Sequence, residues 1–230
     1  MRLTEEERTR LREYRYRGGD ASIAYRLLLS PLAELCVRRL TPTWLPPSTP
    51  RSALPLHSSS LDVITLLGLL FSLLACLLTL VFNPSLDSQT HRELHLVTAV
   101  CVFLYQTLDN MDGKQARRTH TSSALGMFFD HACDAINTTV ISIPVAAALG
   151  TGWTMKAFFG LWCSYIAFYF QTWEEFFVGA MVLPVINGPS EGLLILIAMC
   201  ICSYVYGVEW WQSVCVNRFC YVFELLLEGC

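Results

Sequence analysis

The chain has 230 residues, of which 53% are hydrophobic and 15% charged, against roughly 25% charged in a typical globular protein. Its 16 basic and 19 acidic residues give a net charge of −3, too little charge for a soluble surface or for coating a nucleic acid. These figures exclude a disordered or nucleic-acid-coating chain and favour a polytopic membrane protein.

Residues 1–47 are predicted to form a cytosolic or interfacial arm. Residues 1–40 contain nine of the 16 basic residues of the chain. Within this arm, residues 23–40 place apolar side chains near helical spacing, with Arg26 and Arg38 beside them. This pattern predicts a helix lying in the headgroup region of a membrane. A solvated cap packed on the body of the protein is the alternative.

Residues 48–60 are rich in Pro and Ser and are predicted to be a linker. Residues 61–230 follow as one membrane domain. Its first apolar segment, residues 63–82, has no charge and is long enough for a bilayer core. Further helical spans are predicted at residues 95–108, 124–149, 155–173, 192–206 and 211–227, with a polar connection at 174–190. The fold class is therefore all-α and polytopic, with about six transmembrane helices.

The positions of the basic residues predict the orientation of these spans. The arm before the first span is rich in Arg, and the segment after the second contains Lys114, Arg117 and Arg118. The connection at residues 83–94 has Arg92 alone. Because basic residues of short loops stay in the cytosol, the arm and the charged segment are expected at the cytosolic face.

Four aspartates form two pairs in the most charged part of the domain. Asp109 and Asp112 are spaced i, i+3, and Asp130 and Asp134 are spaced i, i+4, so each pair shares one helix face. Like charges brought together repel unless a cation lies among them. Carboxylate oxygens suit hard cations such as Mg²⁺, and four carboxylates can hold two ions.

Glycines and basic residues accompany the aspartates. Gly113 leaves room for a ligand to approach the backbone, and Lys114 and Arg117 supply positive charge for a diphosphate. Gly126 lies one helical turn before Asp130 and leaves room for a flat group. Structural ion pairs are the alternative. This density of charge in a chain poor in charge favours a functional site.

The spacing Asp109-x2-Asp112-Gly113-x2-Ala116-Arg117-x8-Gly126-x3-Asp130-x3-Asp134 matches the signature of the CDP-alcohol phosphotransferase family. The chain resembles that family, and within it the eukaryotic choline and ethanolamine phosphotransferases. The segments that carry the closer resemblance are LREYRYRGGDAS at 11–22, ITLLGL at 64–69, TWEEFFVG at 172–179 and LPVINGPSEGLLIL at 183–196.

The resemblance implies an enzyme that transfers phosphocholine or phosphoethanolamine from CDP-choline or CDP-ethanolamine to diacylglycerol and releases CMP. It implies two divalent ions, Mg²⁺ or Mn²⁺, bound by Asp109, Asp112 and Asp130. Asp134 would share the second ion and act as the general base. His131 would relay the proton or, alternatively, hold a neighbouring helix by a hydrogen bond.

For the substrate, the resemblance implies that Gly113 and Arg117 contact the diphosphate and that Gly126 makes space near the nucleotide. Relatives usually have an Asn where this chain has Asp62, which we expect to bind the ribose or the cytosine. Relatives also often have a Glu where this chain has Met127. That difference argues against a Glu–His pair and favours Asp134 as the base.

The resemblance further implies a bilayer protein of the endoplasmic reticulum or Golgi membrane whose active site faces the cytosol. A homodimer is considered, and no nucleic-acid partner is expected. Glu174, Glu175 and Glu191 are candidates for recognising an ammonium group, or are simply loop charges.

Three alternatives stay open. One is a truncated, catalytically impaired member that acts as a membrane binding or partner protein. Another is a family member that uses a different acceptor or donor. The last is a divalent-cation transporter, which would not explain the motif spacing of Gly113, Arg117 and Gly126.

Overall fold

The computed structural model describes residues 4–6, 17–41, 61–87, 91–119, 122–211 and 213. Helices make up most of this part, as predicted. Those of at least eleven residues are α2 (Ser30–Leu40), α3 (Leu61–Phe82), α4 (Glu93–Thr119), α5 (Ala124–Ala148), α6 (Met155–Val178) and α7 (Leu193–Tyr206). Short π-helical turns, η1 (Tyr25–Leu29) and η2 (Gly188–Gly192), precede α2 and α7. The predicted linker at 48–60 lies outside the described residues.

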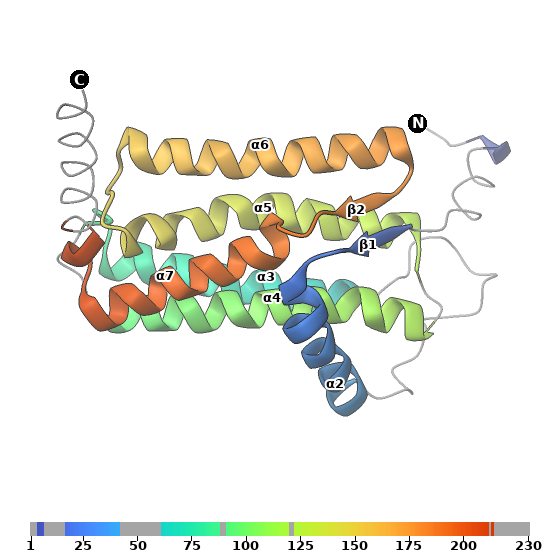
Figure 1. Cartoon of the computed structure of the whole chain (residues 1–230), viewed down its shortest axis with the longest axis horizontal. Coiled ribbons are helices and arrows are strands. Elements are labelled where there is room, and N and C mark those ends of the chain that lie inside the picture. The colour runs from blue at the N-terminus through green and yellow to red at the C-terminus, as the bar shows by residue number, and fades with distance from the viewer. Residues whose placement is uncertain are drawn as a thin grey trace, which may run out of the picture.

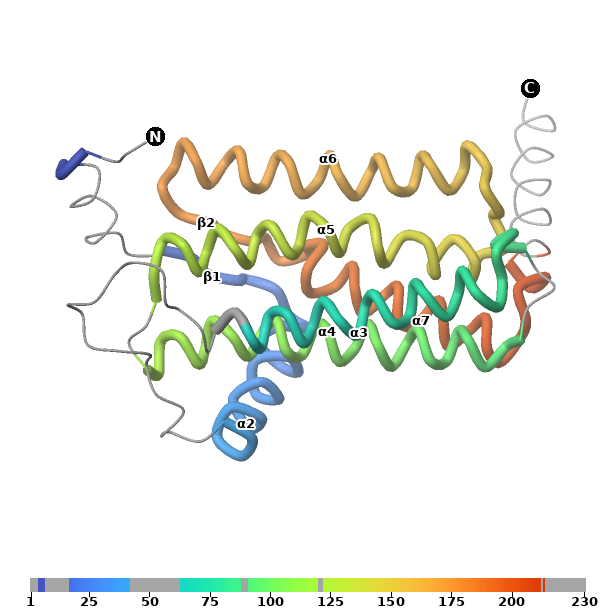
Figure 2. The backbone as a smooth tube through the Cα atoms, turned by 180° about the vertical axis from the view of Figure 1, so that it is seen from behind, coloured from blue at the N-terminus to red at the C-terminus, as the bar shows by residue number. Residues whose placement is uncertain are grey.

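The long helices run side by side along the longest axis of the molecule (Figure 1). α3 packs along α4, and α4 also contacts α2 and α7. α6 lies at the edge of the bundle next to α5, as the view from behind shows (Figure 2). No residue of α6 is fully buried against the described part of the chain, and most of its side chains are exposed. The centre of the bundle is therefore built from α3, α4, α5 and α7.

Two helices are longer than the sequence predicted. The second span was predicted to end at Leu108, but α4 continues to Thr119. The motif segment is rich in good helix formers such as Met, Lys, Gln, Ala and Arg, so its charges do not stop the helix. The fourth span was predicted to end at Trp173, but α6 continues to Val178 and ends at Gly179, whose φ of 70° allows a left-handed cap.

Two segments of the described residues are long and apolar enough to cross a membrane. Residues 63–82 have a mean hydropathy of 2.6, and residues 188–206 have one of 1.6. They coincide with the first and fifth predicted spans. The second, third and fourth predicted spans correspond to the helices α4, α5 and α6. Nearly all of the sixth, at 211–227, lies outside the described residues.

The N-terminal arm contributes a feature that helical periodicity did not predict. Strand β1 (Gly18–Asp20) pairs in parallel with β2 (Met181–Leu183), the segment that follows α6. Both views place these strands side by side (Figures 1 and 2). The backbone of the arm is thereby hydrogen-bonded to a segment more than 160 residues further along the chain.

Helix α2 crosses α4 at an angle (Figure 1). Ala33 and Val37 are buried on one of its faces, against Met111 of α4 and Ile64 of α3. Apolar side chains of the arm that remain exposed are Ile23, Leu27, Leu28, Leu35 and Leu40. The helix thus packs on the body along one face and leaves apolar side chains uncovered, and its placement at a membrane stays a prediction.

Candidate metal and catalytic site

Three of the four motif aspartates meet between α4 and α5. Carboxylate oxygens of Asp109 and Asp112 from α4 and of Asp130 from α5 all lie within 4.8 Å of one another. Asp134 lies close to this group, because its carboxyl interacts with those of Asp109 and Asp112. The helical spacing predicted from the sequence therefore brings both pairs to one place.

The donor set fits a hard divalent cation. All of these ligand atoms are carboxylate oxygens, the ligands that Mg²⁺ and Mn²⁺ prefer. Oδ1 of Asp130 is buried and has no hydrogen-bond partner among the described residues. A buried carboxylate oxygen without a donor is costly, and a cation at this point would satisfy it.

Two hydroxyl groups outside the motif hold these carboxylates. Thr65 of α3 donates to Oδ2 of Asp112 at 2.7 Å, and Tyr105 of α4 donates to Oδ1 of Asp134 at 2.7 Å. Sequence reasoning missed both residues. Tyr105 is one helical turn before Asp109, but its contact with Asp134 on α5 follows only from the packing of these helices. Thr65 is on another helix, and only the packing of α3 on α4 reveals it.

The side chain of Arg117 lies close to Gly113. A Cβ atom placed on Gly113 would be 3.5 Å from Nη1 of Arg117, so the guanidinium lies over the glycine. Gly113 follows Asp112 directly on α4, the helix that also carries Arg117. The predicted contact of Gly113 and Arg117 with a diphosphate stays a prediction.

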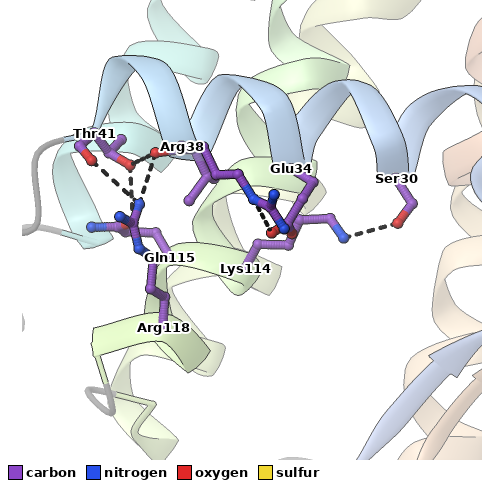
Figure 3. Close-up of polar contacts among 8 residues, drawn as sticks. Ser30, Glu34, Arg38, Thr41, Lys114, Gln115 and Arg118 are labelled. Carbon is purple, nitrogen blue, oxygen red and sulfur yellow. Dashed lines mark hydrogen bonds and ion pairs between the residues drawn. The ribbon is translucent and has the colours of Figure 1, made fainter.

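Lys114 and Arg118 face the N-terminal arm (Figure 3). Nζ of Lys114 donates to the Ser30 hydroxyl at 2.9 Å and lies 5.6 Å from the centre of the Tyr25 ring. Arg118 Nη1 donates to the carbonyl oxygen of Val37 at 2.9 Å. The role of Lys114 in substrate binding stays a prediction, and its observed contact holds the arm on α4.

His131 lies opposite a glutamate of α6. Its Nδ1 is 3.7 Å from Oε2 of Glu175, and both side chains are mostly buried. Glu175 was predicted to be in a polar connection, but the extension of α6 brings it to the site. This contact is compatible with both predicted roles of His131, because a carboxylate can orient a proton relay or join two helices.

The two remaining predicted substrate-binding residues lie at helix starts. The backbone N–H of Gly126 donates to the Ser123 hydroxyl at 3.0 Å, which caps the N-terminus of α5. Asp62 is in the first turn of α3, but its side chain lies outside the described part of the structure. The proposed contacts of Gly126 and Asp62 with the nucleotide stay predictions.

Glu191, a candidate for recognising an ammonium group, is engaged in structural hydrogen bonds. Its Oε1 accepts from the Ser22 hydroxyl at 2.5 Å and from the backbone N–H of Ala24 at 3.2 Å. Its Oε2 accepts from the backbone N–H of Asn187 at 3.1 Å. The carboxylate thus joins the arm to the turn before α7.

Comparison with known proteins agrees with the motif. Residues 61–216 match the family described as CDP-alcohol phosphatidyltransferase. The chain is 38% identical over 204 residues to Choline/ethanolaminephosphotransferase 1 of Arabidopsis thaliana, covering 88% of this chain and 48% of that protein.

It is 34% identical over 199 residues to Cholinephosphotransferase 1 of Saccharomyces cerevisiae, covering 86% of this chain and 47% of that protein. The chain therefore spans about half the length of the curated relatives it matches.

Proposed function

Because this chain belongs to the CDP-alcohol phosphatidyltransferase family, we propose that it transfers phosphocholine or phosphoethanolamine from CDP-choline or CDP-ethanolamine to diacylglycerol. The products would be CMP and phosphatidylcholine or phosphatidylethanolamine. The observation that supports this most is the group of motif carboxylates within 4.8 Å of one another. The names of these two relatives support the choline or ethanolamine class of donor.

Asp109, Asp112 and Asp130 would hold the first divalent ion, with Asp134 sharing a second. Bound Mg²⁺ or Mn²⁺ would neutralise the diphosphate and the charge that develops on the departing CMP. Arg117, which lies over Gly113, would hold the same diphosphate from the other side. Gly126, Lys114 and Asp62 remain proposed contacts to the rest of the CDP-alcohol.

Asp134 would accept the proton of the diacylglycerol hydroxyl. The freed oxygen then forms a bond to the phosphorus that carries the choline or ethanolamine. The bond from this phosphorus to the bridging oxygen of CMP breaks, and CMP leaves with that electron pair. His131, oriented by Glu175, is the alternative path for the proton.

The proposed setting is a bilayer crossed by about six helices, including α3 and α7, which carry the two apolar spans. α2 and the exposed apolar residues before it would lie in the headgroup region, where Arg26 and Arg38 suit anionic lipids. We place the site at the cytosolic face of the endoplasmic reticulum or Golgi membrane. A homodimer is part of the same proposal.

The complete carboxylate group favours an enzyme over a catalytically impaired partner protein. In a member that binds no cation, the mutual repulsion of Asp109, Asp112 and Asp130 at this distance would destabilise the fold with no compensating interaction.

The test is transfer of radiolabelled phosphocholine and phosphoethanolamine, measured side by side in membranes that contain the chain. We expect lipid product only with Mg²⁺ or Mn²⁺, and none from Asp134→Asn. Asp87→Asn, a change outside the aspartate group, is the matched control and should keep wild-type activity. Wild-type activity equal to that of empty membranes would refute the enzyme, and unchanged activity in Asp134→Asn would refute the assignment of the base.

A further inference from the structure

Tyr105 connects the two helices that carry the aspartate pairs. It lies on α4, its side chain is buried, and its hydroxyl is 2.7 Å from Oδ1 of Asp134 on α5. An ionised carboxylate only accepts hydrogen bonds, so the phenol is the donor. This contact reaches the residue proposed as the general base, yet Tyr105 is outside the family motif.

The ring of Tyr105 has little room to move. On one side a Cβ atom at Gly68 of α3 would be only 3.3 Å from the ring carbon Cδ2, so the glycine provides the space that the ring occupies. On another side the ring packs with Val102 and Ile141 in a buried cluster. Because the ring is held between helices, its hydroxyl is fixed at one point relative to Asp134.

We propose that Tyr105 is a positioning residue for the transfer reaction put forward above, on which this inference rests. Its hydroxyl occupies one oxygen of Asp134 and fixes the orientation of the carboxylate. The other oxygen is then available for the second divalent ion and for the proton of the acceptor. Tyr105 acts through Asp134 and touches neither substrate. Partners that orient a ligating carboxylate typically change metal affinity or activity by about 10–100-fold when they are removed.

The experiment compares the full chain with Tyr105→Phe and with the control Tyr169→Phe, which removes a hydroxyl from the exposed helix α6. Binding of Mn²⁺ is followed without any CDP-alcohol, by the electron paramagnetic resonance signal of the free ion. Transfer is then measured at saturating Mn²⁺ to give kcat and the KM for CDP-choline. For Tyr105→Phe we expect Mn²⁺ affinity and kcat to fall about tenfold or more, with an unchanged KM.

Mn²⁺ affinity and kcat of Tyr105→Phe both within twofold of wild type would overturn the proposal, as would an equal loss in Tyr169→Phe. If the wild-type chain transfers nothing while Tyr105→Phe still weakens Mn²⁺ binding, the positioning role stands and the proposed function fails. Should Tyr105→Phe not fold, Gly68→Ala serves instead. The added methyl group would displace the ring by a few tenths of an ångström, and a smaller loss in the same direction is expected.

Discussion

The Ser22 hydroxyl lies 2.5 Å from Oε1 of Glu191, a residue 169 positions further along the chain. A second carboxylate completes this connection. Asp20 accepts hydrogen bonds from the Ser190 hydroxyl at 2.6 Å and from the side-chain amide of Asn187 at 3.0 Å. Together with the pairing of β1 and β2, these contacts make the N-terminal arm and the turn before α7 one hydrogen-bonded unit.

Asp20→Ala should loosen this unit. The change removes the acceptor for Ser190, Asn187 and the backbone N–H of Ser22. Losing these bonds should lower the free energy of local opening of this unit by on the order of 2 kcal/mol. The measurement is hydrogen exchange of the backbone amides in β1 and β2, which should become faster. The exposed residue Glu34, paired with Arg38 on α2, provides the control Glu34→Ala. Equal exchange in the two variants would contradict a specific role of Asp20.

Thr65→Val should weaken metal binding while the fold is kept. Valine has nearly the shape of threonine but cannot donate to Oδ2 of Asp112. We expect about tenfold lower affinity for Mn²⁺, measured by titration without substrate, and recovery in Thr65→Ser. The control is Thr79→Val, because Thr79 is also buried on α3 and its hydroxyl donates to the backbone carbonyl of Ala75. Similar losses in both variants would count against the role of Thr65.

Gly113→Ala should separate substrate binding from folding. The added Cβ would be 3.5 Å from Nη1 of Arg117, which is an ordinary contact. The free energy of unfolding should therefore change only by the small difference in helix propensity between glycine and alanine, and the thermal midpoint should change little. A diphosphate lying against the backbone at this point would meet the new methyl group. We therefore expect a higher KM for the CDP-alcohol, by about tenfold for a lost close contact. An unchanged KM would show that the ligand does not approach Gly113.

Divalent cations should stabilise the protein before any substrate is added. A cation that binds only the folded chain at 100 times its Kd adds about 2.7 kcal/mol to the free energy of unfolding. Thermal unfolding in Mg²⁺ should therefore occur at higher temperature than unfolding in EDTA. Asp130→Asn should shrink this difference, because Oδ1 of Asp130 is buried without a donor among the described residues. Identical unfolding curves for the wild type in Mg²⁺ and EDTA would contradict a metal site.

The sequence predicted the positions that depend on local periodicity. The predicted third span begins at Ala124, where α5 also begins, and the spacing of the aspartates placed each pair on one face. The predicted second and fourth spans end where charged residues begin, at Leu108 and Trp173, whereas the helices α4 and α6 continue to Thr119 and Val178. The cap at Gly179 was the better signal for α6.

Contacts between distant segments could not be predicted in the same way. The pairing of β1 with β2 involves three residues on each side, too few to give a pattern. The donors Thr65 and Tyr105 become visible only when α3, α4 and α5 are packed together. Glu175 lies beside His131 because α6 continues as a helix past Trp173, which the sequence did not predict.

The continuity of α4 has a mechanical consequence. Asp109 and Arg118 are on one unbroken helix, nine residues and therefore about 13.5 Å apart along its axis. Arg118 donates a hydrogen bond to the carbonyl oxygen of Val37 near the end of α2, the helix of the arm. Because an unbroken helix holds its residues at set positions along its axis, α4 fixes the distance between the arm contact at Arg118 and Asp109.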